Sequence, residues 1–261
     1  MKKIAIIGGG NLGTAIAAGL LKSKFSEAKN IIVTKRNTNT LGDLKDKGVN
    51  VSSNNVEAVT ASDIIILAIK PFQIKEILDE IKGCLTPKHI LVSVVTGVSL
   101  KEMDETINKN IPLFRAMPNT AIAIQESITC LSSLHANEKQ IEYVNTLFST
   151  LGKIAVIDEK LMNAATVLGA CGTAFAMRYI RANIQGGIEI GFDAATASLI
   201  AAQTVKGAAE LLLTTKTHPE QEIDKVTTPK GCTIAGLNEM EHQGFSSSLI
   251  KGITASYVKI G

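Results

Sequence analysis

The stretch Lys3-Ile4-Ala5-Ile6-Ile7-Gly8-Gly9-Gly10-Asn11-Leu12-Gly13 lies near the start of the chain and decides its fold. Residues 3–7 are almost all apolar and predict a buried strand, whereas residues 11–21 have the apolar spacing of a helix. Between them Gly8, Gly10 and Gly13 form the pattern G-x-G-x-x-G. In this context Gly8 permits the tight turn, Gly10 leaves room for a pyrophosphate, and Gly13 lets the helix pack closely on the strand. The stretch therefore predicts a dinucleotide site; the alternative is a glycine-rich turn without a ligand.

The end of the second expected strand, residues 30–34, indicates which dinucleotide binds. An acidic residue about 20 positions after the glycines binds the ribose 2′-hydroxyl of NADH, whereas a basic residue accommodates the 2′-phosphate of NADPH. Lys35 and Arg36 follow this strand, and no acidic residue stands beside them. We therefore expect NADPH, with NADH less favoured. In the alternative, both residues are simply solvated charges in a loop.

Strand and helix patterns alternate over the first 157 residues. Further strands are expected at residues 49–51, 63–69, 89–94, 111–115, 127–132 and 154–156, and helices at 40–47, 71–82 and 137–150. Another helix follows Ser99, which forms a capping box with Glu102. The pattern predicts an α/β fold in which residues 1–157 form a Rossmann-like doubly wound sheet. Its ligand edge is the carboxyl ends of the strands.

From Asp158 onward the strand patterns stop and the sequence becomes rich in alanine. Helices are expected at about residues 159–170, 174–186, 194–213, 219–224, 233–243 and 247–259. We expect residues 158–261 to form an all-helical domain for substrate binding and dimerisation. Its many small residues suit close helix packing at a subunit interface, although a compact monomeric bundle has a similar composition.

The composition of the 261 residues argues against several classes of function. The net charge is only +3, aromatic residues make up 4%, and tryptophan is absent, which gives no support for nucleic-acid binding. Apolar runs are shorter than the ~18 residues that a membrane span requires. The four cysteines are widely spaced, as in proteins of a reducing compartment. We expect a cytoplasmic protein with a small-molecule ligand and with no nucleic-acid or membrane partner.

Metal binding is not expected either. Glu239 and His242 have the i, i+3 spacing of a metal-binding helix, but the other helices lack the matching acidic motifs.

The most distinctive segment of the helical region is residues 226–235. Pro229-Lys230-Gly231 predicts a turn leading into a helix, where the backbone N–H groups of Gly231, Cys232 and Thr233 can bind an anion. A small carboxylate bound there would allow the Thr233 hydroxyl to bond another polar atom of the same ligand. In the alternative, Thr233 is only a helix cap.

Taken in order, the motifs resemble those of the pyrroline-5-carboxylate reductases over essentially the whole chain. Besides the glycine turn, they are Ala68-Ile69-Lys70-Pro71, Arg115-Ala116-Met117-Pro118-Asn119-Thr120 and Thr228-Pro229-Lys230-Gly231-Cys232-Thr233. Enzymes of this family reduce the C=N bond of 1-pyrroline-5-carboxylate with NAD(P)H and form L-proline, the last step of proline biosynthesis. The resemblance therefore implies an oxidoreductase of this kind, and a homodimer that assembles into a larger homo-oligomer.

The resemblance also implies the residues of the site. Those that bind the cofactor would be Ile7, Gly8, Gly10, Asn11, Leu12, Lys35, Arg36, Asn55, Ala68, Ile69, Lys70, Pro71, Val94, Val95 and Thr96. Those that bind the substrate would be Glu159, Gly231, Cys232 and Thr233. Among the latter, Gly231 and Cys232 would bind the substrate carboxylate through their backbone, and Thr233 would bond the ring nitrogen as the catalytic residue.

One segment and three single positions depart from the family pattern. The segment S-G-S-G-P-A is here G-A-C-G-T-A at residues 169–174, and Arg181 stands where the family has an acid. Lys230 replaces a glycine and Thr228 a serine. The first two departures lie in helices that form the dimer core and the active-site floor of the family, so they bear on substrate preference and assembly.

Two other functions are compatible with the sequence. One is NADPH-dependent reduction of another imine or of a small carbonyl acid. A hydroxyacid dehydrogenase would need a catalytic lysine in the first helix of the second domain, where Lys160 is the only candidate. The other is a non-catalytic NADPH-sensing protein, for which the intact loop at residues 228–233 would have no purpose.

Overall fold

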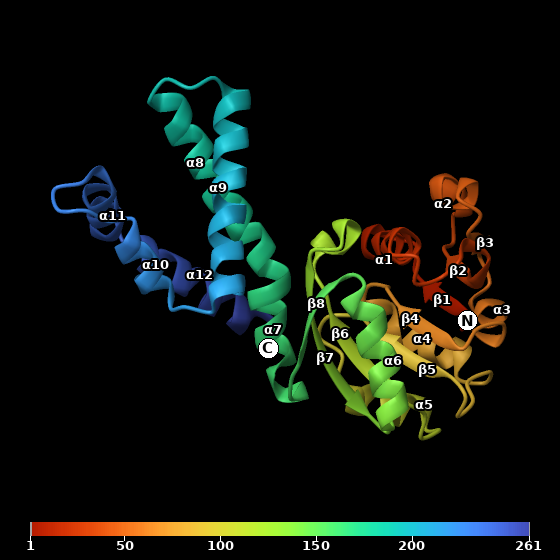
Figure 1. Cartoon of the computed structure of the whole chain (residues 1–261). Coiled ribbons are helices and arrows are strands. Elements are labelled where there is room, and N and C mark those ends of the chain that lie inside the picture. The colour runs from red at the N-terminus through yellow and green to blue at the C-terminus, as the bar shows by residue number, and fades with distance from the viewer. Residues whose placement is uncertain (1, 261) are drawn as a thin grey trace. The chain divides into compact units, whose positions relative to one another are not determined.

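The structure, a computed structural model, describes residues 2–260, and these divide into two compact units (Figure 1). The first unit consists of residues up to Cys171 together with Ile260, and the second of residues 172–259. Residues 158–171 thus group with the first unit, while the domain boundary that we expect at residue 157 stays a prediction.

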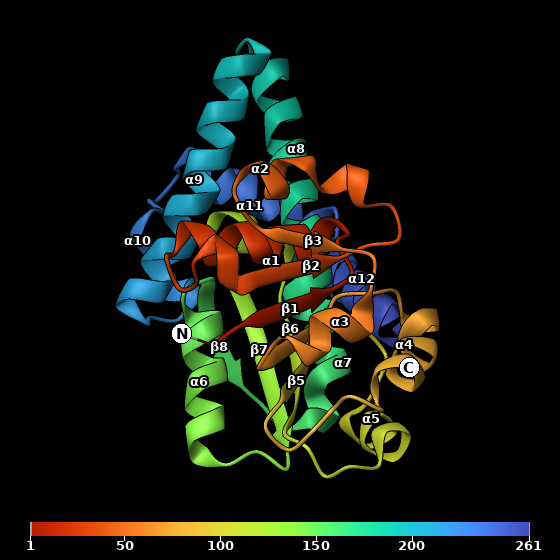
Figure 2. The same ribbon diagram turned by 90° about the vertical axis from the view of Figure 1, so that its right-hand side faces the viewer.

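The first unit is built on one eight-stranded sheet with the order β3-β2-β1-β4-β5-β6-β7-β8. In Figure 2 the strands of this sheet lie between the helices that cover its two faces. All neighbouring strands are parallel except β6 and β7. The strands are β1 Ile4–Ile7, β2 Ile31–Thr34, β3 Asn50–Ser52, β4 Ile64–Leu67, β5 Ile90–Ser93, β6 Leu113–Met117, β7 Ser127–Leu134 and β8 Gly152–Val156.

Each face of the sheet is covered by its own apolar core. Ile4 and Ile6 pack on one side with side chains of α1 and α6, and Ala5 and Ile7 pack on the other with side chains of α3, α4 and α5. This alternation follows from the two-residue period of a strand. The helices of this unit are α1 Asn11–Lys22, α2 Gly42–Asp46, α3 Asn55–Thr60, α4 Ile74–Ile81, α5 Leu100–Ile107, α6 Glu138–Ser149 and α7 Met162–Ala165. The expected Rossmann-like sheet is confirmed.

Strand β7 departs from the regular parallel pattern. It pairs antiparallel with β6, and the link between them, residues 118–126, contains only a 3₁₀ turn at Thr120–Ile124. A parallel crossover needs a dozen or more residues, so this short link forces the chain to reverse direction. Strand β6 also lies two residues later than expected, which places Arg115 in the middle of the strand.

Two helical segments differ from the sequence prediction. Helix α3 was not expected; the side chain of Asn54 starts it by accepting a hydrogen bond from the Glu57 N–H group at 3.0 Å. The break expected at residues 171–173 is wrong, because a π-helix at Thr166–Cys171 leads directly into α8, Gly172–Glu189. Here the segment lacks the proline of the family pattern, so no residue loses its N–H donor and the helix continues.

The second unit is entirely helical, as expected. It contains α8, α9 (Ala194–Thr215), α10 (Pro219–Lys225), α11 (Cys232–His242) and most of α12 (Phe245–Ile260). Helices α8 and α9 lie side by side (Figures 1 and 2) and approach closely at Gly187, where an added Cβ would lie 3.1 Å from that of Ala197. Across the described residues, no helix combines the length and the apolar character that crossing a membrane requires.

The start of α5 carries the expected capping box. The N–H and hydroxyl groups of Ser99 both donate to the Glu102 carboxylate at 2.7 Å, and the Glu102 N–H group donates to Ser99 Oγ at 3.1 Å. The hydrogen bond from the Ser99 N–H group, followed by that from its hydroxyl, holds the pKa of Glu102 below its usual range. A carboxyl group whose pKa is lower in the folded state stabilises the fold above the unfolded pKa, and this contribution is lost as the pH falls through the folded pKa.

We therefore predict that Glu102→Gln lowers the free energy of unfolding near neutral pH, and that its difference from wild type shrinks below about pH 4. Urea unfolding at several pH values measures both effects. The matched control is Asn137→Ala at the start of α6, whose capping box contains the uncharged Gln140. Its cost of about 1 kcal/mol should not change over the same pH range. A Glu102→Gln effect that grows towards acid pH would contradict this account.

Candidate active site

The turn between β1 and α1 has the geometry that its glycines predict. Gly8 has φ +109°, and a side chain there would overlap the Ala68 carbonyl group. A side chain at Gly13 would overlap the Gly8 carbonyl oxygen. The N–H groups of Gly8 and Gly9 both donate to the Thr34 carbonyl oxygen, at 3.1 and 2.7 Å. The turn is thereby tied to the ends of β2 and β4.

Gly10 differs from these glycines because an added Cβ there would meet no atom within 4 Å. It is the N-cap of α1, and no side chain caps the helix or places a negative charge in its first turn. The first N–H groups of a helix have no partner within the helix and lie at the positive end of its dipole. The start of α1, with Asn11 and Leu12, can therefore receive the anionic pyrophosphate of a dinucleotide.

The basic residues after β2 lie at the same edge of the sheet. The Lys35 N–H group donates to the Ser52 carbonyl oxygen at 3.0 Å, which continues the pairing of β2 with β3. The Arg36 side chain is exposed, and its Nη2 lies 3.7 Å from Oε1 of Glu76, which is also exposed. An exposed ion pair at this distance contributes little energy, so Arg36 is free to bind a phosphate.

Asn55 is fixed beside these residues by its side-chain amide. Its Oδ1 accepts from the Thr34 hydroxyl at 2.6 Å, and its Nδ2 donates to Glu80 at 3.0 Å. These bonds hold the first residue of α3 against the end of β2.

The other residues expected to bind the cofactor follow β4 and β5. The Ala68 N–H group donates to the Ile7 carbonyl oxygen at 2.8 Å, and that of Val94 donates to Leu67 at 3.0 Å. Val94 and Val95 are buried, whereas Lys70 and Pro71 are exposed. The structure thus brings all the cofactor-binding residues predicted from the sequence to the carboxyl edge of one sheet.

Glu159 belongs to the same unit and has two partners there. Its Oε1 accepts a hydrogen bond from the Leu100 N–H group at the start of α5. The same oxygen lies 3.3 Å from Nη1 of Arg115, whose side chain is only 5% exposed. Arg115 belongs to the motif at residues 115–120 but was not among the site residues predicted from the sequence. The signal for it is a charged residue next to an apolar strand pattern.

Gly231, Cys232 and Thr233 lie together at the start of α11, in the helical unit. Gly231 is the N-cap and Cys232 the first helical residue, so Thr233 is not the capping residue, and no side chain caps this helix. A Cβ at Gly231 would lie 2.6 Å from Thr228 Oγ1, which explains the glycine. Lys230 has φ +58°, a conformation that glycine adopts more readily, and stands where the family pattern has glycine.

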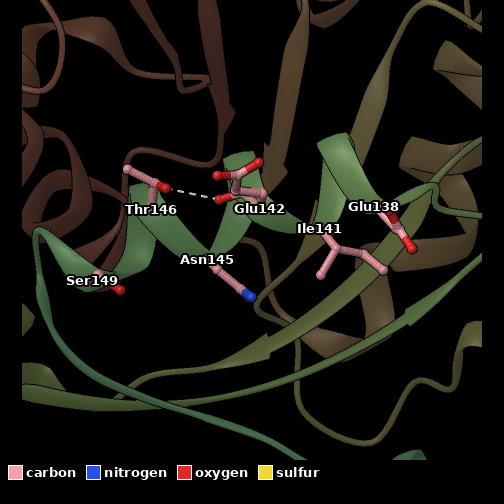
Figure 3. A pocket seen from close by; sticks show the side chains of 6 residues that line it. All are labelled: Glu138, Ile141, Glu142, Asn145, Thr146 and Ser149. Atoms are coloured by element: carbon pink, nitrogen blue, oxygen red, sulfur yellow. Dashed lines mark hydrogen bonds between the residues drawn. The ribbon is translucent and has the colours of Figure 1, made fainter.

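A surface hollow of about 420 Å³ lies elsewhere in the first unit, and we assign it no role. Figure 3 shows that it is formed along α6, and it contains none of the predicted site residues. Its lining residues are Glu138, Ile141, Glu142, Asn145, Thr146 and Ser149. Within residues 2–260, no three histidine, cysteine or acidic side chains are grouped so as to hold a metal ion.

Comparison with known proteins identifies the family. Residues 159–260 match a family model described as pyrroline-5-carboxylate reductase dimerisation. Residues 3–97 match a model described as NADP oxidoreductase coenzyme F420-dependent. Pyrroline-5-carboxylate reductase 2 of Dictyostelium discoideum is 42% identical over 99% of this chain and 92% of its own length. The chain belongs to the pyrroline-5-carboxylate reductase family.

Two further comparisons extend this result. Pyrroline-5-carboxylate reductase 1 of Dictyostelium discoideum is 48% identical over 97% of the chain, but the chain spans only 48% of that relative's length. A crystal structure of Plasmodium falciparum pyrroline carboxylate reductase with NADP bound superimposes with a TM-score of 0.91 at 27% identity. It covers 99% of this chain and 96% of its own. The family and fold predicted from the sequence are confirmed.

Two glycines of the turn, Gly8 and Gly10, should respond differently to substitution by alanine. Gly8→Ala should cost about 2 kcal/mol or more of unfolding free energy, because the new side chain overlaps the Ala68 carbonyl group at a positive φ. Gly10→Ala should cost less than about 1 kcal/mol but weaken NADPH binding about tenfold, by crowding the first N–H groups of α1. Urea unfolding and fluorescence titration with NADPH measure these effects. Wild-type affinity in Gly10→Ala would contradict the assignment of the turn.

Proposed function

We propose that the chain catalyses the NADPH-dependent reduction of 1-pyrroline-5-carboxylate to L-proline. The observation that carries this proposal is its membership of the pyrroline-5-carboxylate reductase family along almost its whole length. The open glycine turn and the uncapped start of α11 support it independently.

The first unit would hold the cofactor along the carboxyl edge of the sheet. The start of α1, with Gly8, Gly10, Asn11 and Leu12, would bind the pyrophosphate. Lys35 and Arg36 would bind the 2′-phosphate, since arginine matches the geometry of a phosphate group. The segments after β4 and β5 would contact the remainder, with residues 94–96 near the nicotinamide.

The start of α11 would hold the substrate. The N–H groups of Cys232 and Thr233 are suited to the substrate carboxylate because they lie at the positive end of an eleven-residue helix. The Gly231 N–H group, which the sequence also suggested for this carboxylate, instead donates to the Thr228 carbonyl oxygen at 2.9 Å. The Thr233 hydroxyl, which is not used for capping, would donate a hydrogen bond to the ring nitrogen. Glu159 would be the acidic residue of the site.

NADPH, when bound, supplies the hydride that reduces the imine carbon. The protein's part is to hold the ring in a fixed orientation and to support its nitrogen as that atom gains a proton. An imine is a better hydride acceptor when its nitrogen is protonated or strongly hydrogen-bonded. The Thr233 hydroxyl would provide this support directly or through a water molecule, as a general acid does.

We also propose that the protein works in the cytoplasm as a homodimer that assembles further. In the helical unit only Ala197 and Ala201 are buried hydrophobic residues. Large apolar side chains are exposed on its helices, among them Met177, Ile188, Leu199, Leu211, Leu213, Ile250 and Val258. Exposed apolar surface on this scale is typical of a subunit interface.

The absorbance of NADPH measures the proposed reaction directly. Purified protein should oxidise NADPH when 1-pyrroline-5-carboxylate is added and should form proline in equal amount. Other cyclic imines and small carbonyl acids, tested in parallel, should react more slowly. NADPH binding without oxidation of any substrate would instead indicate a sensing protein and overturn the proposal.

Arg36 should determine the preference for NADPH over NADH. Arg36→Ala removes a charged donor from the 2′-phosphate, so it should raise KM for NADPH about tenfold or more and leave KM for NADH almost unchanged. Lys45→Ala, an exposed substitution on α2 with the same change of charge, is the matched control and should alter neither constant. An equal effect of Arg36→Ala on both cofactors would refute this role.

Thr233 should act through its hydroxyl group. Thr233→Ala should lower kcat on the order of 10²-fold while the affinity for NADPH stays within about twofold of wild type. Thr233→Ser keeps the hydroxyl and should retain most of the turnover. Steady-state kinetics and NADPH titration of both variants test this, and unchanged turnover in Thr233→Ala would remove the assignment.

A further inference from the structure

Arg115 lies in an unusual place for a charged side chain. It occupies the middle of β6, a strand whose residues are all buried, and is itself only 4% exposed. Only its Nη1 has a partner, the Glu159 carboxylate, whereas Nε and Nη2 are buried and make no hydrogen bond among the described residues. Burying a charge with an incomplete set of hydrogen bonds is unfavourable, so stability alone does not account for this arginine.

Arg115 lies close to the ligand edge of the sheet. In the strand register it pairs with Ser93, the last residue of β5, and with Ser132 of β7. Ser93 Oγ accepts a hydrogen bond from the Val95 N–H group at 3.2 Å, and the Ser132 hydroxyl is buried and has no hydrogen-bond partner among residues 2–260. A row of polar side chains therefore crosses an apolar sheet at the point where the segment 94–99 begins.

The Glu159 carboxylate connects this row to the other end of the same segment. It accepts from the Leu100 N–H group, the first of α5, while Arg115 holds it from the side of the sheet. We call these three groups, the Arg115 guanidinium, the Glu159 carboxylate and the Leu100 N–H group, the carboxylate clamp. The clamp joins β6, the start of α5 and the first residue of the 3₁₀ turn Glu159–Leu161.

We propose that Arg115 is a positioning residue for the reduction, acting through Glu159. By holding this carboxylate on the Leu100 N–H group, Arg115 fixes both the acid and the segment 94–99 at the carboxyl edge of the sheet. The inference rests on the proposed function, in which residues 94–96 contact the nicotinamide and Glu159 belongs to the site. It assigns Arg115 no contact with substrate or cofactor.

The clamp itself can be tested without any assay of activity. Arg115→Met and Glu159→Ala should both accelerate hydrogen–deuterium exchange at the Leu100 amide, because each variant loosens or removes its acceptor. Arg115→Lys keeps the positive charge but lacks the planar guanidinium group, so it should retain part of the protection that Arg115→Met loses. Wild-type exchange at Leu100 in Arg115→Met would overturn the clamp.

Kinetics test the positioning role. Arg115→Met should lower kcat/KM for 1-pyrroline-5-carboxylate about tenfold or more, because Glu159 and the segment 94–99 are no longer held in place. The Kd for NADPH should stay within about twofold of wild type. The double variant Arg115→Met/Glu159→Ala should be no worse than Glu159→Ala alone, since Arg115 acts through Glu159. The role would be overturned if the two substitutions lowered kcat/KM additively in the double variant, or if Arg115→Met kept the wild-type kcat/KM.

A control separates positioning from general destabilisation of the sheet. Leu131 of β7 pairs with Ala116 and packs in the core that contains Ile4 and Ile6. Leu131→Ala should lower thermal stability through a cavity but leave kcat/KM per folded molecule at the wild-type value. If wild-type protein does not oxidise NADPH with 1-pyrroline-5-carboxylate, the proposed function and the positioning role fail together. The exchange of Leu100 then still decides whether the clamp exists.

Discussion

The close approach of α1 to β1 is the constraint on which the first unit depends. A side chain at Gly13 would overlap the Gly8 carbonyl oxygen, and one at Gly8 would overlap the Ala68 carbonyl group. The end of β1, the first turn of α1 and the residue after β4 therefore meet with only backbone between them. The end of β2 is joined to the same turn, because the Thr34 carbonyl oxygen accepts hydrogen bonds from the Gly8 and Gly9 N–H groups. Because these contacts fix the start of α1 at the edge of the sheet, they also fix its free N–H groups at the edge where the proposed dinucleotide would bind.

The Arg115–Glu159 pair performs a comparable task by electrostatics rather than by close packing. The glycine turn joins its segments because side chains are absent, whereas the carboxylate clamp joins β6, α5 and the residues after β8 because two charged groups are present. Burying such a pair costs desolvation energy, so its contribution here is to define the local geometry rather than to add stability. The glycine turn and the carboxylate clamp both lie towards the carboxyl edge of the sheet, where the residues of the proposed site must be held in position.

The sequence predicted most elements of the fold because their signals are local. A continuous apolar run before a glycine turn, or a Ser99–Glu102 capping box, specifies its element without knowledge of the rest of the chain. The direction of β7 depends instead on the length of its link to β6 and on the partner that the strand finds. Similarly, the π-helix at Thr166–Cys171 is not a property of its own residues alone, which also suit an ordinary helix. The clamp joins residues 59 and 44 positions apart, and nothing in a single sequence signals such a contact.

The helix starts show which part of the site was predictable on physical grounds. Helices α3, α5, α6 and α9 begin at Asn, Ser or Asp residues whose side chains accept a backbone hydrogen bond. Helices α2, α4 and α7 continue directly from 3₁₀ turns. Helices α1 and α11 begin instead at glycines, Gly10 and Gly231, and no side chain caps either. Helix α12 also follows a glycine, Gly244, so a glycine start alone does not mark an anion site. A side-chain cap would occupy the N–H groups that an anion needs, so a glycine at the N-cap leaves them available. The cofactor pyrophosphate and the substrate carboxylate of the proposed reaction are both anions. The local sequence predicts an anion site at each of these two helix starts, and the family resemblance adds that the anion at α11 is the substrate carboxylate.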